Sequence, residues 1–265
     1  MKARVEILVV GLIAVVSAPQ ANSAFRYDNW WRHTAPSGQP AEAASNVRPS
    51  AYDEMLIANG VDPSSDKGRL ILAWIARIDG DPVVIGNIQR VSKLFVTSSA
   101  RAELMADGLE RMLPALRLEY VALVTKILDT LVPVDCFGLN DMSAVIDRVP
   151  LSAMADADID EYFRILLAGL RAADADTAPE RPTPQRFAQA EASLKLSLLR
   201  ELGYTPADVA RYAAYSANPQ GANPRDACWA MRVTMHAILG MPDSERDVVV
   251  RGMVQSRRVS PAPSR

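Results

Sequence analysis

Apolar residues recur at helical spacing along most of this chain. In the segment 66–79 they lie three or four residues apart, at Leu70, Ile71, Trp74, Ile75 and Ile78. The segment 114–132 repeats this spacing over a longer stretch. Such spacing brings the apolar side chains to one face of an α-helix. A half-buried β-strand would instead alternate apolar and polar residues, and no stretch does so convincingly. The pattern predicts an all-α fold with roughly eight to ten helices in an irregular bundle.

Capping residues, prolines and glycines set the predicted helix boundaries. Ser65, Thr183 and Asn223 each offer a side-chain oxygen to a following helix, and Gly203 and Gly240 each follow a helix end. The predicted helices cover approximately residues 51–59, 66–79, 82–95, 100–113, 114–132, 140–149, 157–172, 183–202, 205–215, 224–239 and 243–255.

The turn before the predicted helix 205–215 carries two agreeing signals. Thr205 and Asp208 have the spacing of a capping box, and Tyr204 and Val209 have the spacing of a hydrophobic staple. We therefore expect Tyr204 to pack against Val209.

The first 24 residues have the composition of a leader. Lys2 and Arg4 precede an apolar run from Ile7 to Ala18, which small and polar residues follow. This order is typical of a secretory signal peptide. The run is shorter than the roughly 20 apolar residues that cross a bilayer. We expect residues 1–24 to be removed, so that the mature chain starts at Phe25 and has no integral membrane segment.

The remainder divides into three parts by composition. Residues 25–49 form an aromatic segment and a Pro/Ala/Ser-rich linker, residues 50–255 a single helical domain, and residues 256–265 a flexible tail. The Asp/Ala/Pro-rich stretch 173–183 is a possible subdivision of the helical domain, although a surface loop within one domain explains it better.

Four aromatic side chains gather at the predicted mature N-terminus, namely Phe25, Tyr27, Trp30 and Trp31. Exposed on a tail they would be a liability, so we expect them to be buried somewhere. They either fold back into a groove of the helical body, or form a contact patch for a partner protein or a membrane interface.

Charge excludes some partners. The chain carries 29 basic and 31 acidic residues, a net charge of −2, with no long run of one sign. A nucleic-acid binder would carry a basic stripe, so we expect no nucleic-acid partner. An anionic membrane surface attracts clusters of about four to eight basic residues. Arg257 and Arg258 are too few to form such a cluster.

Cys136 and Cys228 are the two cysteines of the chain. An even count in an exported protein favours a disulfide, and two buried free cysteines are the alternative. Only His33 and His236 could add imidazole ligands, and neither lies at a metal-binding spacing from the cysteines. We therefore expect a Cys136–Cys228 disulfide, no metal site and no cofactor.

Candidate catalytic groups have structural explanations. His236 lies on the most apolar predicted helix, where a hydrogen-bonded structural histidine is expected. Asp156, Asp158, Asp160 and Glu161 form the densest acidic group, which resembles the start of an EF-hand calcium loop. Glu161 stands where that loop needs glycine, so acids at a helix start explain the group better.

These observations favour a non-catalytic role. We expect an exported protein, periplasmic or secreted, that acts as an envelope binding or interaction protein of accessory or inhibitor type. An envelope protein is its expected partner. The alternative is a cell-envelope hydrolase that uses paired carboxylates, with one pKa raised by burial. Two buried acids within several ångströms of each other would favour the hydrolase, and an apolar patch would favour the binding protein.

Overall fold

The computed structural model describes residues 51–86, 98–174 and 181–259 of the chain. All regular secondary structure in these ranges is helical, which confirms the predicted fold class. The α-helices are α1 (Ala51–Ala58), α2 (Asp66–Asp79), α3 (Pro82–Gly86), α5 (Ser98–Arg111), α6 (Pro114–Thr130), α7 (Met142–Asp147), α8 (Asp156–Asp174), α9 (Pro184–Glu201), α10 (Pro206–Ala217), α11 (Pro224–Leu239) and α12 (Asp243–Val259). Within the described ranges, none of these helices has both the length and the apolar character that a membrane span needs.

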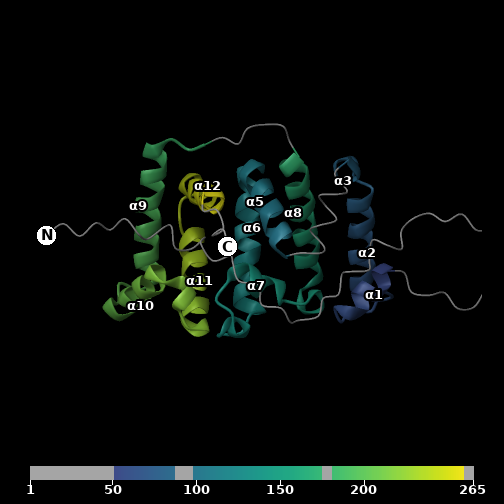
Figure 1. The fold of residues 1–265 in the computed structure, drawn as a ribbon, viewed down its shortest axis with the longest axis horizontal. Coiled ribbons are helices and arrows are strands. Elements are labelled where there is room, and N and C mark those ends of the chain that lie inside the picture. The colour runs from purple at the N-terminus through teal and green to yellow at the C-terminus, as the bar shows by residue number, and fades with distance from the viewer. Residues whose placement is uncertain (1–50, 87–97, 175–180, 260–265) are drawn as a thin grey trace, which may run out of the picture.

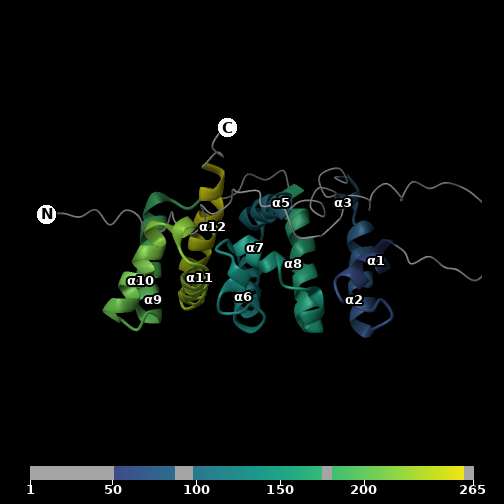
Figure 2. The same ribbon diagram turned by 60° about the horizontal axis from the view of Figure 1, so that its bottom comes forward.

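Five helices form a row. They lie in the order α9, α11, α6, α8 and α2, and each packs on the next (Figures 1 and 2). Helices α5 and α12 pack against members of this row and against each other. The row does not follow the chain order, because α11, from the C-terminal part, lies between α9 and α6. The result is an elongated array of helices rather than a closed bundle.

One apolar core runs along this array. Ile71 of α2, Leu128 of α6, Ile159 of α8 and Ile238 of α11 are all buried within it. These side chains come from both sides of the 175–180 segment, which separates α8 from α9. Burial of one shared core couples the helices before and after that segment.

A buried ion pair lies within the array. Arg117 of α6 is only 1% exposed at its side chain, and its Nε lies 2.6 Å from Oδ1 of Asp247 on α12. The guanidinium also donates to the carbonyl oxygens of Leu109 and Met112 at the end of α5. Arg251 contributes a second cation 2.9 Å from Asp247. Three helices are thus joined by charge-assisted hydrogen bonds.

The predicted caps are largely confirmed. Side-chain oxygens of Ser65, Thr183 and Asn223 accept hydrogen bonds from backbone N–H groups at the starts of α2, α9 and α11. Pro184 and Pro224 occupy the first helical turns, where no backbone donor is needed.

The predicted capping box before α10 is wrong. Thr205 stands at the N-cap without a side-chain cap hydrogen bond, and the side chain of Tyr204 is 64% exposed. Gly203 and Tyr204 both have positive φ angles, 59° and 55°. The exposure of Tyr204 gives no support to the predicted packing on Val209.

The C-terminal boundary also differs from the prediction. Helix α12 continues to Val259, although a tail was expected from residue 256. Serine and arginine are compatible with a helix, whereas Pro261 disfavours helical backbone at the residue before it. The predicted leader (1–24), the aromatic segment and linker (25–49) and residues 260–265 lie outside the described residues.

Candidate functional site

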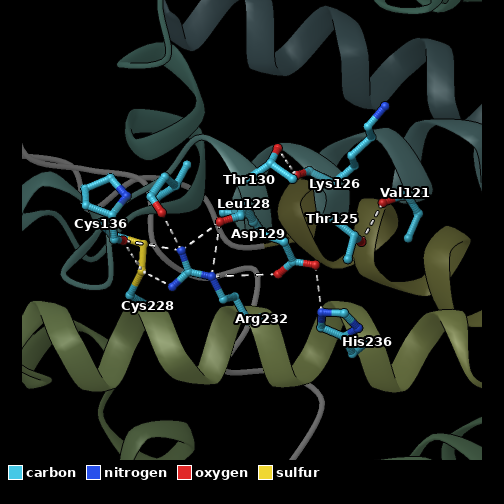
Figure 3. Close-up of polar contacts among 12 residues, drawn as sticks. Val121, Thr125, Lys126, Leu128, Asp129, Thr130, Cys136, Cys228, Arg232 and His236 are labelled. Carbon is cyan, nitrogen blue, oxygen red and sulfur yellow. Dashed lines mark hydrogen bonds and ion pairs between the residues drawn. A yellow bond between two sulfur atoms is a disulfide. The ribbon is translucent and has the colours of Figure 1, made fainter. Parts of the chain in front are cut away.

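The predicted disulfide is confirmed. Cys136, in a short 3-10 helix (Cys136–Gly138), is bonded to Cys228 of α11, with their Cα atoms 5.4 Å apart (Figure 3). Both cysteines are fully buried. The bond attaches the segment after α6 to the α11 helix, 92 residues later in the chain.

The segment that contains Cys136 has an unusual backbone. We call residues 133–139 the disulfide loop. Three consecutive members have positive φ angles: Cys136 at 49°, Phe137 at 57° and Gly138 at 76°. Glycine adopts this region freely, but cysteine and phenylalanine rarely do. Such a conformation persists only where the surroundings hold it.

The disulfide loop turns two apolar side chains outward. Val134 is 69% exposed and Phe137 is 40% exposed, while Cys136 between them is buried. Asp135 and Gly138 are also exposed. The loop therefore has an inner side that is bonded to α11 and an outer side that shows two apolar groups to the surroundings.

Arg232 of α11 holds the base of the disulfide loop. Its Nη2 donates to the carbonyl oxygens of Leu128 and Val132, both at 2.7 Å, and to that of Pro133 at 3.3 Å (Figure 3). Its Nη1 lies 3.0 Å from Sγ of Cys228. The last carbonyl groups of a helix have no partner inside the helix and carry partial negative charge, so a guanidinium is well suited to this place.

Asp129 and His236 lie beside this clamp. His236 Nε2 is 2.9 Å from Asp129 Oδ2, and Asp129 Oδ1 is 3.8 Å from Arg232 Nε (Figure 3). The side chain of His236 is 41% exposed, so the expectation of a buried histidine is wrong, although a structural partner was expected correctly. The residue belongs to the α6-facing edge of α11, where it reaches the surface.

Nearby hydroxyl groups are bonded to their own helix. Thr125 donates to the carbonyl oxygen of Val121, and Thr130 donates to that of Lys126, both at 2.7 Å (Figure 3). This i to i−4 bond is an ordinary structural use of threonine in a helix.

The acidic group at the start of α8 does not converge on one point. Asp158 lies 2.5 Å from Lys126 Nζ, and Asp160 accepts a hydrogen bond of 2.8 Å from the indole of Trp74. Asp156 lies 3.8 Å from Lys67 Nζ. Separate partners on α6 and α2 thus engage these acids, as expected of structural acids at a helix start. In the described part of the chain, no group of three or more His, Cys, Asp or Glu side chains is arranged to hold a metal ion.

The pKa values of three carboxyl groups, those of Asp62, Asp81 and Asp226, are shifted downward. Backbone and side-chain hydrogen bonds from Ser64 lower the pKa of Asp62. Burial raises the pKa of Asp81, but hydrogen bonds from Arg171 and from backbone N–H groups outweigh it, so this pKa is lowered overall. Hydrogen bonds from Arg211 and Asn223 lower the pKa of Asp226. A glycosidase general acid needs the opposite shift.

The structure does not test the aromatic residues that the sequence suggested for partner contact. Phe25, Tyr27, Trp30 and Trp31 lie outside the described residues. Sequence reasoning did not identify Val134, Phe137 or Arg232. A usable signal was present, because the predicted disulfide implied a constrained Cys136, and the apolar Val134 and Phe137 lie near it between Pro133 and Gly138.

Comparisons of the chain with protein-family models, with curated proteins and with solved structures gave no match.

Proposed function

We propose that this chain is an exported, non-catalytic interaction protein of the cell envelope, and that it contacts its partner through the disulfide loop. The observation that carries this proposal is the display of Val134 and Phe137 on a backbone that the disulfide and Arg232 hold in a left-handed conformation. The partner is a protein with an apolar recess.

Rigidity supports a recognition role for this loop. A binding loop that is already in its bound conformation loses little conformational entropy on association. Aromatic side chains that insert into a pocket contribute much of the binding energy at many interfaces. Both arguments apply to Phe137, because it is an exposed aromatic side chain on a constrained backbone.

The placement of these apolar groups distinguishes them from others on the surface. The other large exposed apolar side chains of the described residues each lie singly along the chain, namely Ile57, Ile85, Leu113, Leu196 and Tyr204. Single exposed apolar side chains need no special explanation. Val134 and Phe137 instead occur within four residues on one loop, with the exposed Asp135 between them. A basic group at the rim of the partner's recess would complement this carboxylate.

The disulfide supports the proposed location. Disulfides persist in oxidising compartments and are rare in the cytosol. A periplasmic or secreted protein would meet this condition, and the leader-like composition of residues 1–24 agrees with it.

The hydrolase alternative receives no comparable support. Asp156, Asp158 and Asp160 are engaged by different helices. The lowered pKa values of Asp62, Asp81 and Asp226 favour the ionised form of these carboxyl groups.

Site-specific photo-crosslinking tests the proposed contact. A photoreactive residue is placed at position 134 or 137 of the full chain, in cells that naturally produce it, and at position 196 as a control. Leu196 is 59% exposed on α9, so it matches Val134 in exposure but not in location. We expect the same discrete crosslinked product from 134 and 137 and none from 196. Equal products from all three positions, or none from 134 and 137, would contradict the proposal.

Measurement of the Kd then gives the contribution of Phe137 to binding. Against the purified crosslinked partner, Phe137→Ala should weaken binding about tenfold or more, the cost of losing a central aromatic contact. Leu196→Ala should leave the Kd unchanged. An unchanged Kd for Phe137→Ala would overturn the assignment of the contact residue.

A further inference from the structure

The two sulfurs of the disulfide lie in different settings. Cys228 is on α11, within a run of buried side chains that includes Ala227, Ala230 and Met231. Cys136 is on the disulfide loop, and its neighbours on both sides are exposed. Cys136 therefore lies beneath exposed residues of a loop, whereas Cys228 lies among buried side chains of a helix in the row.

A cation distinguishes the sulfurs further. Arg232 Nη1 lies 3.0 Å from Sγ of Cys228, one helical turn along α11. Hydrogen bonds to the carbonyl groups of Leu128 and Val132 hold the guanidinium in this place independently of the disulfide. A cation at hydrogen-bond distance favours a thiolate over a thiol.

Other groups near this sulfur moderate the effect. Asp129 of α6 lies 3.8 Å from Arg232 Nε and offsets part of its charge. The carbonyl oxygen of Pro133 lies 3.3 Å from Sγ of Cys228. In the described part of the chain, the guanidinium of Arg232 is the cationic group that lies at hydrogen-bond distance from this sulfur.

We propose that Cys136 is the sulfur at which this disulfide exchanges with an external thiol, and that Cys228 is the leaving group. The thiolate of the external molecule attacks Sγ of Cys136 and forms a mixed disulfide with it. The Sγ–Sγ bond breaks, and its electron pair leaves on Cys228 as a thiolate beside Arg232. Exchange favours departure of the sulfur with the more stable thiolate.

A second thiol completes the reaction. Its thiolate attacks the external sulfur of the mixed disulfide, which releases Cys136 as a thiolate and forms an external disulfide. Two thiols are thereby oxidised to one disulfide, and two electrons reduce the protein. The reverse sequence forms the bond, with Cys228 as the attacking thiolate. The external reactant is a small thiol or a dithiol oxidoreductase, and the assignment does not depend on the proposed partner contact.

Trapping of the mixed disulfide tests which sulfur is attacked. The full oxidised chain is mixed with reduced glutathione, exchange is stopped with acid at short times, and peptides are mapped by mass. We expect glutathione on Cys136 at least about tenfold more often than on Cys228, because the residues beside Cys136 are exposed and its leaving group, Cys228, lies beside Arg232. Glutathione on Cys228, or equally on both cysteines, would overturn the proposal. A dithiol oxidoreductase with its resolving cysteine removed should be trapped on the same residue.

The role of Arg232 needs a readout other than stability. In the Cys136→Ser background, the ultraviolet absorbance of the Cys228 thiolate is followed against pH, with and without Arg232→Gln. We expect thiolate to form at lower pH when Arg232 is present. Arg232→Lys keeps the charge and serves if Arg232→Gln does not fold; it should stay close to the parent profile. Arg211→Gln, which removes an arginine paired with Asp226, is the matched control and should leave the profile unchanged. Identical profiles with and without Arg232 would overturn its assigned role.

Discussion

Two arginines hold the backbone together at positions where the chain changes direction. Arg117 donates to the carbonyl groups that end α5 and to Asp247 of α12. Arg232 donates to the carbonyl groups that end α6. A guanidinium has five N–H donors in a planar fork, so one side chain can satisfy several acceptors at once. A lysine at either position would supply one compact ammonium group instead.

The buried pair of Arg117 and Asp247 should be important for stability. Arg117→Met removes the Arg117 partner from the buried carboxylate of Asp247, and should lower the free energy of unfolding by about 3 kcal/mol or more. Denaturant unfolding followed by circular dichroism measures this value. The control is Arg164→Gln, which breaks an exposed pair with Glu119 and should cost less than about 1 kcal/mol. Equal losses for the two variants would refute the prediction.

Asp81 should make stability depend on acidic pH. Its side chain is buried, accepts hydrogen bonds from Arg171, and caps α3 through the N–H groups of Val83 and Val84. Because its folded-state pKa is lowered, the stabilisation is present above the unfolded pKa of about 3.9 and is lost as the pH falls through the folded value.

Asp81→Asn should therefore reduce stability by about 1–2 kcal/mol at pH 7, as expected for a lost cap and charge partner. The difference from the unmodified chain should begin to narrow below about pH 4, where Asp81 of the unfolded chain takes up a proton, and the charge contribution should be lost once the pH falls below the lowered folded-state pKa. Unfolding at several pH values measures it, with the exposed Glu54→Gln as a control. A difference that stays constant down to pH 2 would rule out this titration.

At the level of elements, the close approach of α5 and α8 depends on glycine. Helices α5 and α8 meet at Gly108 and Gly169. A Cβ atom on Gly108 would lie 2.5 Å from the carbonyl oxygen of Gly169 and 2.7 Å from its Cα. A Cβ atom on Gly169 would meet the flexible ends of Met112 and Met105 instead, at 2.8 and 3.4 Å. Backbone cannot move aside as a methionine can, so the two glycines are not equivalent.

Alanine substitution should affect stability differently at Gly108 and at Gly169. Gly108→Ala should destabilise the fold by about 1–3 kcal/mol, the cost of overpacking, despite the better helix propensity of alanine. Gly169→Ala should change stability by less than about 1 kcal/mol, since the methionines can rearrange. Thermal or denaturant unfolding of both variants checks the order. If Gly169→Ala is the more damaging change, the close approach of the two backbones is not the reason for glycine.

At the scale of the whole molecule, connections cross from residues 51–174 to residues 181–259. They include the disulfide, the Arg117–Asp247 pair and the Arg232 clamp. In the chain-entropy model, a disulfide that closes so long a loop stabilises the fold by about 4–5 kcal/mol. The shared core adds apolar contacts across the same boundary.

These connections predict a single unfolding transition. Trp74 on α2 reports on the part before 175–180, and Trp229 on α11 reports on the part after it. Each is made the sole tryptophan by substitution of the other and of Trp30 and Trp31 with phenylalanine. In each variant, the midpoint from tryptophan fluorescence should coincide with that from helical circular dichroism. Separate midpoints would instead identify 175–180 as a link between two independent units.

The sequence alone determined the local structure of this protein. Apolar spacing of three and four residues identified the helices, since that spacing is required to bury one helix face. Ser65 and Asn223 were identified as caps because a side-chain oxygen must satisfy the first N–H groups. The even number of cysteines, together with the expected export, identified the Cys136–Cys228 bond.

Only the tertiary structure decided the order of helices in the row and the groups that meet there. Arg117, Arg232 and Asp129 have ordinary positions in their helices, and nothing in their local spacing indicates which acceptor they will meet. The outward direction of Phe137 depends on three successive left-handed residues, which no local preference of cysteine or phenylalanine would predict. Those contacts depend on residues about a hundred positions apart, so they are defined only when the helices pack.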